Sequence, residues 1–285
     1  MTSAADELTI ALVLVAALLH ASWNALAKAS GDPLVNIAIQ TSTGGLIGVP
    51  LMLWLPWPGP ETWRWLALSA VLHFLYELNL ARMYRLGDLS QVYPIARGLA
   101  PLGVALLGAL FVDERLAWTQ VAGLVVSGCA IVVLGRSGGG SAASRRAVTT
   151  ALVVALLIGL YTYSDGRGVR SEDDPFVYIA WSMFVGCVPL AFFTVVVRRQ
   201  RLREAFRSDA CRAIFGGMMA TVGYGIALWA MSRTPLALVA SLRESSVLFA
   251  ALIGAFLLRE SFGLRRILAS AALVVGIVLV QIEFG

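Results

Sequence analysis

Residues 106–116 read LLGALFVDERL, and a second stretch of the same pattern, LIGAFLLRESF, follows at residues 252–262. The offset between them is 146 residues (252 minus 106), about half of the 285-residue chain. The same offset places Arg97 on Arg243, and both arginines lie inside apolar runs. The chain is therefore predicted to consist of two related halves, each with a cation at an equivalent buried position.

The composition indicates a membrane protein. Hydrophobic residues make up 59% of the chain and charged residues only 14%, whereas about a quarter of the residues in a soluble domain are charged. The mean hydropathy is +0.80, and apolar runs of about 20 residues, the length that crosses a bilayer, recur from end to end. The acidic start, residues 1–7, lacks the basic region and cleavage site of a signal peptide, so we expect the first apolar run to remain as a helix.

Ten membrane-spanning helices are predicted, which makes the chain an all-α polytopic membrane protein. Their approximate ranges are Leu8–Ala27, Pro33–Leu55, Trp65–Tyr84, Leu89–Val112, Leu116–Leu134, Val148–Gly166, Pro175–Val197, Cys211–Ser232, Leu236–Leu258 and Leu264–Ile282. A Gly/Ser-rich linker at residues 135–147 separates a first five-helix repeat, residues 1–134, from a second, residues 148–285. Because five is odd, the second repeat must be inverted relative to the first, and we expect the two to enclose a central cavity.

Basic residues are unevenly distributed among the predicted loops. Loops after odd-numbered helices hold fourteen of them, and loops after even-numbered helices hold five. The positive-inside rule then places the odd loops in the cytoplasm and both termini outside. The longest basic stretch, residues 198–212, is expected to be a loop. Twenty-one of the 22 basic residues are Arg, which hints at a GC-rich bacterial gene, so we expect the inner membrane of a bacterium.

The sequence argues against several other classes of function. The net charge of +5 comes from clustered loop residues, which are typical of topology signals rather than of a nucleic-acid surface. Cys129, Cys187 and Cys211 show neither metal-ligand spacing nor a disulfide framework. The sequence contains no GxSxG, P-loop or His-rich metal motif, so no cofactor, no metal and no enzymatic activity are expected.

The ends of predicted helices 4 and 9, residues 107–116 and 253–262, each carry small residues, an apolar run and a Gly-Glu-x-Leu-like ending. Together with residues 121–133 of helix 5, they resemble the EamA family of the drug/metabolite transporter superfamily. The resemblance implies an alternating-access carrier of small organic solutes, with a central cavity lined mainly by helices 1, 3, 4, 6, 8 and 9. It also implies that Arg243 matches basic residues with which members that carry phosphorylated sugars hold their anion. Many family members keep both termini inside, and the loop charges of this chain depart from that pattern.

Arg97 and Arg243 are the strongest candidates for a substrate site. Each lies about 11–12 Å into its helix, and because the two helices start on opposite faces of the membrane, both side chains approach the midplane. A guanidinium in hydrocarbon costs roughly 2.5–3.5 kcal/mol, so it normally faces a partner or a hydrated cavity. Its planar fork of donors suits a carboxylate, phosphate or phosphonate. The alternative is a structural salt bridge between Arg97 and Glu77.

Other polar and aromatic side chains complete the candidate site. The residues expected to contact the substrate are Arg97, Arg243, Tyr93, Glu77, Glu244, Trp23, Asn24, Tyr163, Tyr224 and Ser246. Trp23 and Tyr163 correspond at an offset of 140 (163 minus 23), and either can stack on a substrate amine, unless they only pack between helices. Glu244 is a candidate for the same amine, and the alternative is an ion pair with Arg82 or Arg233.

Four buried ionisable groups are candidates for proton coupling: Glu77, His73, Glu244 and Asp165. His73 and Glu77 are i, i+4 neighbours on one helix face. A carboxyl in a low-dielectric surrounding holds its proton more readily than in water, so it can exchange that proton near neutral pH. The alternative is a static network between Glu77 and Arg97.

These features predict a secondary-active transporter of a small anionic or zwitterionic organic metabolite, such as an amino acid, a phosphonate or an organic acid, coupled to protons or working as an exchanger. An exporter of organic cations or drugs is the alternative within the same class. A membrane-embedded enzyme or sensor is the alternative of another class. The expected partners are the solute and the lipid bilayer. One chain holds both halves, so a monomer suffices, and a homodimer is compatible with the sequence.

Overall fold

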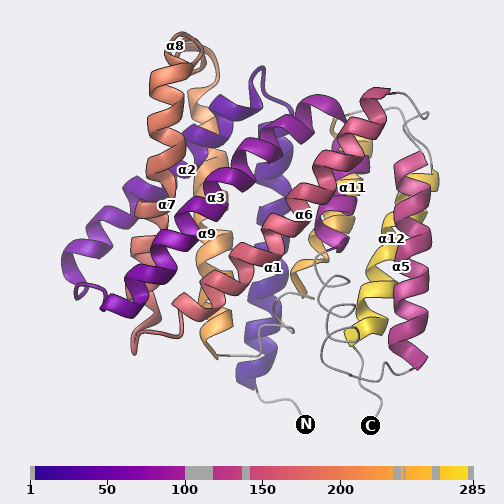
Figure 1. The fold of residues 1–285 in the computed structure, drawn as a ribbon, viewed down its shortest axis with the longest axis horizontal. Helices are drawn as coiled ribbons and strands as arrows, with labels where there is room; N and C mark the ends of the chain where they lie inside the picture. The colour runs from indigo at the N-terminus through magenta and orange to yellow at the C-terminus, as the bar shows by residue number, and fades with distance from the viewer. Residues whose placement is uncertain are drawn as a thin grey trace.

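The computed structural model describes residues 4–99, 118–136, 142–233, 239, 242–258 and 264–281, and this part of the chain is helical without strands. The helices are α1 (Ala4–Lys28), α2 (Pro33–Trp54), α3 (Pro60–Leu86), α5 (Trp118–Arg136), α6 (Ala142–Gly168), α7 (Pro175–Val197), α8 (Arg199–Ser208), α9 (Ala210–Arg233), α11 (Ser246–Phe256) and α12 (Leu264–Gln281). Residues 89–99 are helical as well. Figure 1 shows them as one bundle with α8 at one end. The prediction of an all-α fold is confirmed.

Several helices have the length and composition of membrane spans. Within the described ranges, five are long and apolar enough to cross a bilayer: Glu7–Lys28, Pro33–Trp54, Ser144–Gly168, Pro175–Val197 and Ala210–Arg233. Trp118–Leu134 and Ser246–Phe256 are apolar but shorter. α3 has the length, with 27 residues, but ionisable side chains such as His73 and Glu77 make it less apolar.

α2 and α7 begin in the same way. Each has proline at its first position, Pro33 and Pro175, where a helix leaves the backbone N–H without a partner in any case. The aspartate before each proline caps the helix: Asp32 and Asp174 accept the N–H two residues further on, at 3.1 and 2.9 Å. The predicted starts of both helices are therefore confirmed.

Helices from the first and second halves of the chain pack against each other in pairs. α1 packs on α9, α3 on α6, α2 on α7 and α5 on α12, and the last pair stands side by side in Figure 1. Glycine permits the close approach of α9 to α2, because a Cβ at Gly217 would lie 2.6 Å from the carbonyl oxygen of Gln40. The small residues of α9 thus serve helix packing.

Residues 198–212 contain helix α8, and the prediction of a loop there was wrong. Leu202 and Ala205 lie on one face of α8 and pack against Ile39 of α2 and Ala213 of α9. The many arginines of this stretch obscured its amphipathic spacing, because the apolar face is only a few residues wide. α8 is therefore an anchored element at the end of the bundle.

The helix predicted over residues 236–258 is interrupted. Residues 242–243 are helical, Glu244 and Ser245 form a turn, and α11 begins at Ser246. The N–H of Ser245 donates to the carbonyl oxygen of Leu242 at 3.2 Å, and the N–H of Val247 donates to that of Glu244 at 2.9 Å. Each of these hydrogen bonds spans three residues instead of the four of an α-helix. The interruption directly follows Arg243, and interrupted helices commonly carry the binding sites of transporters.

Some sequence features fall outside the described residues. They include the signature at 106–116 and the last part of its copy, residues 259–262. Of the predicted linker, residues 135–147, the described parts are helical, since α5 ends at Arg136 and α6 begins at Ala142.

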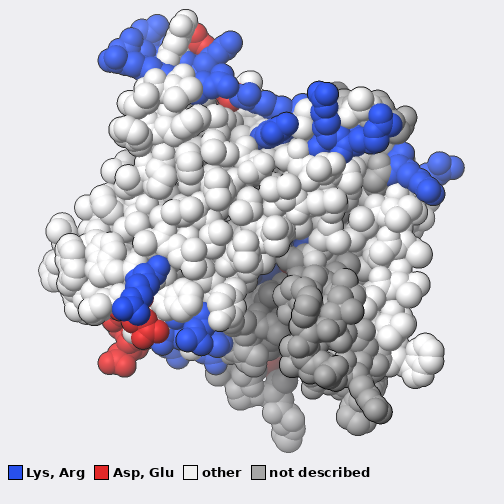
Figure 2. Space-filling model, viewed as in Figure 1, with Lys and Arg blue, Asp and Glu red and all other residues white. Residues whose placement is uncertain are grey.

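The two ends of the bundle differ in charge. α1 begins and α12 ends at the end opposite to α8 (Figure 1). On the face shown in Figure 2, Lys and Arg gather mainly at the α8 end. Arg85 pairs there with Asp32 at 2.5 Å, and Arg266 pairs with Asp88 at 2.9 Å. This is the asymmetry that the loop composition predicts.

Candidate functional site

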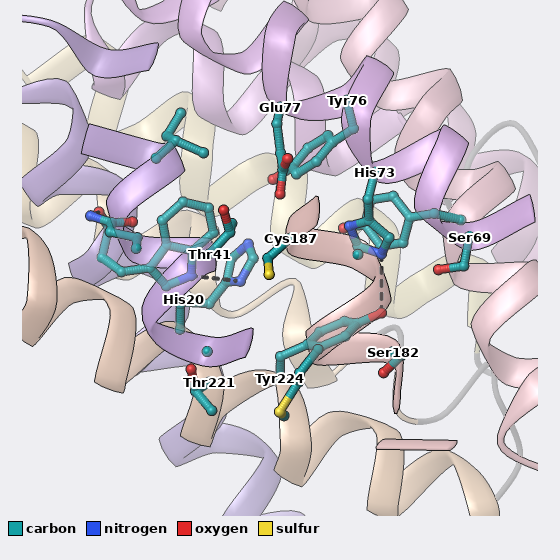
Figure 3. A pocket seen from close by; sticks show the side chains of 18 of the residues that line it. His20, Thr41, Ser69, His73, Tyr76, Glu77, Ser182, Cys187, Thr221 and Tyr224 are labelled. Carbon is teal, nitrogen blue, oxygen red and sulfur yellow. Dashed lines mark hydrogen bonds between the residues drawn. The ribbon is translucent and has the colours of Figure 1, made fainter. Parts of the chain in front are cut away.

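A cavity of about 120 Å³ lies between α1, α2, α3, α6, α7 and α9. Its polar and aromatic lining includes His20, Trp23, Gln40, Ser69, His73, Tyr76, Glu77, Tyr161, Tyr224 and Arg243. Figure 3 shows Glu77 and His73 of α3 and Tyr224 of α9 directed toward the same space. The resemblance implied helix 4 as part of the wall; its described part, residues 89–99, does not line the cavity, and α2 and α7 contribute to it.

Arg243 is buried, with 4% of its surface exposed, and lines this cavity. Across the described residues, its guanidinium has no hydrogen bond and no carboxylate within 4.0 Å. An arginine stays protonated in proteins, so Arg243 cannot escape its burial by losing charge. A buried charge without a partner is strongly destabilising. The cavity is therefore where a counter-ion would compensate it.

His20 contributes a second unused donor to the wall. The indole N–H of Trp23 donates to His20 Nδ1 at 3.3 Å, so the neutral imidazole carries its proton on Nε2. Nε2 is buried and has no hydrogen-bond partner in the described part of the chain. Together with Arg243, this N–H gives the cavity the character of an anion site.

Glu77 and Gln40 supply the opposite chemistry. Glu77 is 5% exposed, and its buried Oε2 has no partner among the residues described. Oε1 of Gln40 is also buried without a partner among the residues described. The amide nitrogen of Gln40 donates to Oδ1 of Asn36 at 2.7 Å. Both side chains line the cavity with Arg243. The wall thus combines unused donors and unused acceptors.

Asp165 is fully engaged by neighbouring side chains. Its Oδ1 accepts hydrogen bonds from Ser69 at 2.5 Å and from Tyr178 at 2.7 Å. Its Oδ2 accepts from Tyr224 and lies 3.1 Å from His73 Nε2. His73 and Tyr224 line the cavity, whereas Asp165 itself does not. The carboxylate therefore ties α3, α6, α7 and α9 together beside the cavity.

In the described ranges, no group of three His, Cys, Asp or Glu side chains is arranged to hold a metal ion.

Arg97 forms an ion pair with Glu244 and does not line the cavity. Its Nη2 lies 2.9 Å from Glu244 Oε1, and both side chains are 4% exposed. The alternatives of an Arg97–Glu77 salt bridge and of a pair between Glu244 and Arg82 or Arg233 are therefore wrong. The helical segment that carries Arg97 and the turn that carries Glu244 lie close enough for each charge to neutralise the other. The expected convergence of two guanidinium groups on the cavity is not met in this structure.

Three further candidates hold helices together. The Tyr93 hydroxyl donates to Ser246 Oγ at 3.0 Å, which links residues 89–99 to α11. Asn24 accepts from the Tyr84 hydroxyl at 2.5 Å, which links α1 to α3. None of the three lines the cavity in this structure.

Tyr163 lies on the outside of α6. It is 59% exposed, and its ring centroid is 6.3 Å from that of Trp65. Tyr161 lines the cavity instead, stacked on His73 at 4.3 Å. Two residues rotate a helix by about 200°, so Tyr161 and Tyr163 face opposite ways, while Asp165 shares the face of Tyr161.

Sequence reasoning thus found part of the cavity wall. The predicted residues that line it are Trp23, His73, Glu77, Tyr224 and Arg243. The wall also contains His20, Gln40 and Tyr161, for which no role was predicted. The available signals were a histidine three residues before Trp23 on the same helix face, and two amides four residues apart, Asn36 and Gln40, in an apolar helix.

The model of the EamA-like transporter family matches residues 7–136 and 145–282. The chain belongs to the EamA-like transporter family. Membership confirms the resemblance seen in the sequence and makes the chain a multi-pass membrane protein. It points to a membrane transporter rather than to an enzyme.

Similarity to individual proteins is distant. A chloroplastic WAT1-related protein of Arabidopsis thaliana is 23% identical over 195 residues, 65% of this chain and 46% of that protein. An uncharacterized transporter of Archaeoglobus fulgidus is 26% identical over 113 residues, 40% of this chain and 38% of that protein. The matches span less than half of each relative. A crystal structure of a protein with 18% identity covers 96% of both chains at a TM-score of 0.65, which shows the fold alone.

Proposed function

We propose that this chain is a secondary-active transporter, working by alternating access, that binds a small anionic or zwitterionic organic metabolite in the central cavity. The observation that carries the proposal is the buried guanidinium of Arg243, which lines the cavity without a counter-ion among the described residues. Its fork of donors matches a carboxylate, phosphate or phosphonate. The unused Nε2–H of His20 adds another donor for the same anion.

The size of the cavity supports a small solute. Pockets for drug-sized ligands enclose about 300–1,000 Å³, whereas this cavity has about 120 Å³. Trp23, Tyr76 and Tyr161 give it apolar faces on which a compact solute can pack. An exporter of simple organic cations fits less well, because Arg243 would repel its cargo.

Helix packing supports two inverted five-helix repeats. In the predicted order of ten helices, α9 is helix 8, so α1 corresponds to α6 and α9 corresponds to α3. The contact between α1 and α9 therefore has a counterpart in the contact between α6 and α3, which is also observed. The pairs α2–α7 and α5–α12 are unchanged by the same exchange. A pseudo-twofold axis in the membrane plane requires this pattern. The separate family matches to residues 7–136 and 145–282 agree with the predicted halves, 1–134 and 148–285.

Proton coupling or exchange completes the proposal. Glu77 and His73 line the cavity, and His73 contacts Asp165, so a proton could move with the solute. Glu244 would take part only if its ion pair with Arg97 opened. We place the chain in a bacterial inner membrane with both termini outside, because basic residues gather at the α8 end.

Uptake into proteoliposomes tests the proposal. Amino acids, organic acids and phosphonates are offered to the wild type, to Arg243→Gln and to Arg64→Gln, which removes an exposed arginine of α3. We expect the first variant to lose at least about tenfold in uptake, the value of one charged hydrogen bond, and the second to transport normally. Full uptake by Arg243→Gln, or uptake of quaternary amines with which carboxylates do not compete, would contradict the proposal.

A further inference from the structure

The cavity wall has unused groups of both signs. The donors are Arg243 and the Nε2–H of His20, and the acceptors are Oε2 of Glu77 and Oε1 of Gln40. Each of these acceptor atoms is buried and has no partner in the described part of the chain. A ligand with only an acid group would satisfy the donors and leave a buried carboxyl without a partner, which is costly in a low-dielectric site.

We infer that the transported solute carries an ammonium group as well as an acid group, and that Glu77 is the residue that selects for the amine. The inference rests on the proposed function, since it names the chemistry of the solute that Arg243 would bind. An ammonium has a full charge and three donors, and rotations of the Glu77 and Gln40 side chains, whose unpartnered oxygens are covered in this structure, would let it satisfy both. The neighbouring rings of Tyr76 and Tyr161 add faces that attract a cation.

The other acids near the cavity are already occupied. Asp165 accepts hydrogen bonds from three hydroxyl groups and contacts His73. Glu244 is paired with Arg97 through Oε1 and does not line the cavity, although its Oε2 has no partner among the described residues. Glu77 is thus the one carboxyl on the cavity wall formed by the described residues.

Matched ligand pairs isolate the contribution of the amine. A hydroxy acid keeps the carboxylate and shape of an amino acid but has one donor and no positive charge. A site built around a donor rejects an analogue that lacks it, because its own acceptor is then left unpaired. We expect the amino member of a pair to bind roughly 10- to 100-fold more tightly than the hydroxy member.

The experiment measures affinity by calorimetry on the full chain purified in detergent. The probes are 2-, 3- and 4-amino acids and their hydroxy acid counterparts, namely alanine with lactate, leucine with 2-hydroxyisocaproate, β-alanine with 3-hydroxypropionate, and 4-aminobutyrate with 4-hydroxybutyrate. Glu77→Gln is compared with Glu61→Gln, which neutralises an exposed acid of the same helix. We expect Glu77→Gln to bind both members of the preferred pair alike, and Glu61→Gln to keep the wild-type preference.

The outcomes separate this inference from the proposed function. Equal affinity of the wild type for both members of every pair, with loss of binding in Arg243→Gln, overturns the amine selection and leaves the anion site standing. Binding of none of the probes overturns the inference, while the proposed function, which also covers phosphonates, is then decided by the uptake assay. An unchanged preference in Glu77→Gln, together with lost proton-driven uptake, would assign Glu77 to proton transfer and overturn the inference. If Glu77→Gln does not fold, Glu77→Asp serves instead and should weaken binding of the amino member only.

Discussion

Buried charges in this chain fall into two kinds. Arg97 and Glu244 pair with each other, although Nε of Arg97 and Oε2 of Glu244 have no hydrogen-bond partner among the described residues, and Asp165 is held by several side chains. Arg243 and Glu77 are equally buried but line a cavity, and neither forms an ion pair or a hydrogen bond with the described residues. The second kind is destabilising unless a ligand compensates it, which is the physical basis for assigning it to function.

The Arg97–Glu244 pair predicts strongly non-additive mutations. Glu244→Leu leaves the buried guanidinium without a counter-ion, so we expect a loss of about 3–5 kcal/mol in stability. Arg97→Leu should cost a similar amount. The double change replaces the pair by apolar side chains and should recover most of the loss. Thermal melting of the purified variants measures this cycle, and losses that simply add would show that the two residues do not form a pair.

Asp165→Asn is expected to destabilise the bundle. An amide offers one oxygen in place of two, so at least one hydroxyl donor is left without its acceptor, at a cost of about 1–3 kcal/mol. Asp173→Asn, at an exposed position after α6, is the matched control and should melt like the wild type. Equal melting temperatures for the two variants would contradict the network around Asp165.

Sequence reasoning could identify the buried charges but not their pairing. Arg243 and Glu77 stand out because an ionisable side chain inside an apolar run needs an explanation. The alternative pairing of Arg97 with Glu77 was wrong, since Glu244 comes 147 positions after Arg97 (244 minus 97) and reaches it only through tertiary packing. Tyr163 was chosen over Tyr161 because the alignment of the halves did not fix the rotation of α6.

Helix starts were easier to predict than helix interruptions. The Asp-Pro pairs before α2 and α7 contain both a cap and a residue suited to the first turn, and their positions were correct. The turn at Glu244 and Ser245 has no Pro or Gly to mark it. α8 was missed because its apolar face is narrow and becomes evident only where α2 and α9 pack on it.

Close packing of α9 on α2 predicts a sharp contrast between two glycine substitutions. A Cβ at Gly217 would meet backbone of α2 at 2.6 Å, whereas a Cβ at Gly159 of α6 meets nothing within 4 Å. Gly217→Ala should therefore lower stability by about 1–3 kcal/mol, the usual cost of overpacking. Gly159→Ala should be neutral or slightly stabilising. Melting curves in one detergent compare them, and a stable Gly217→Ala would show that α2 and α9 are further apart.

In the whole molecule, basic residues are concentrated at one end of the bundle, and helices from the two halves of the chain pack against each other. Most Lys and Arg on the face in Figure 2 lie at the α8 end, and α1 begins and α12 ends at the other end. The cavity is lined by helices from the first and the second half of the chain. If the proposed alternating access holds, a rocking of one half against the other would expose such a site to either side.

The orientation is testable with reporters at the C-terminus. If the α8 end faces the cytoplasm, a C-terminal alkaline phosphatase should be active and a C-terminal green fluorescent protein dark, because the terminus lies outside. Replacing the α8 arginines Arg199, Arg203 and Arg207 by Gln should make the topology mixed. A bright fluorescent fusion in the unmodified chain would reverse the assignment.

If Arg243 is the anion-binding group of the cavity, its substitution must weaken the binding of an acidic ligand. Calorimetry with the best acidic ligand compares the wild type, Arg243→Lys and Arg243→Gln. We expect a graded loss: lysine keeps the charge but not the planar fork, and glutamine removes both, with affinity lower by roughly 10- to 150-fold. Wild-type affinity in Arg243→Gln, with the ligand still bound in the cavity, would contradict it.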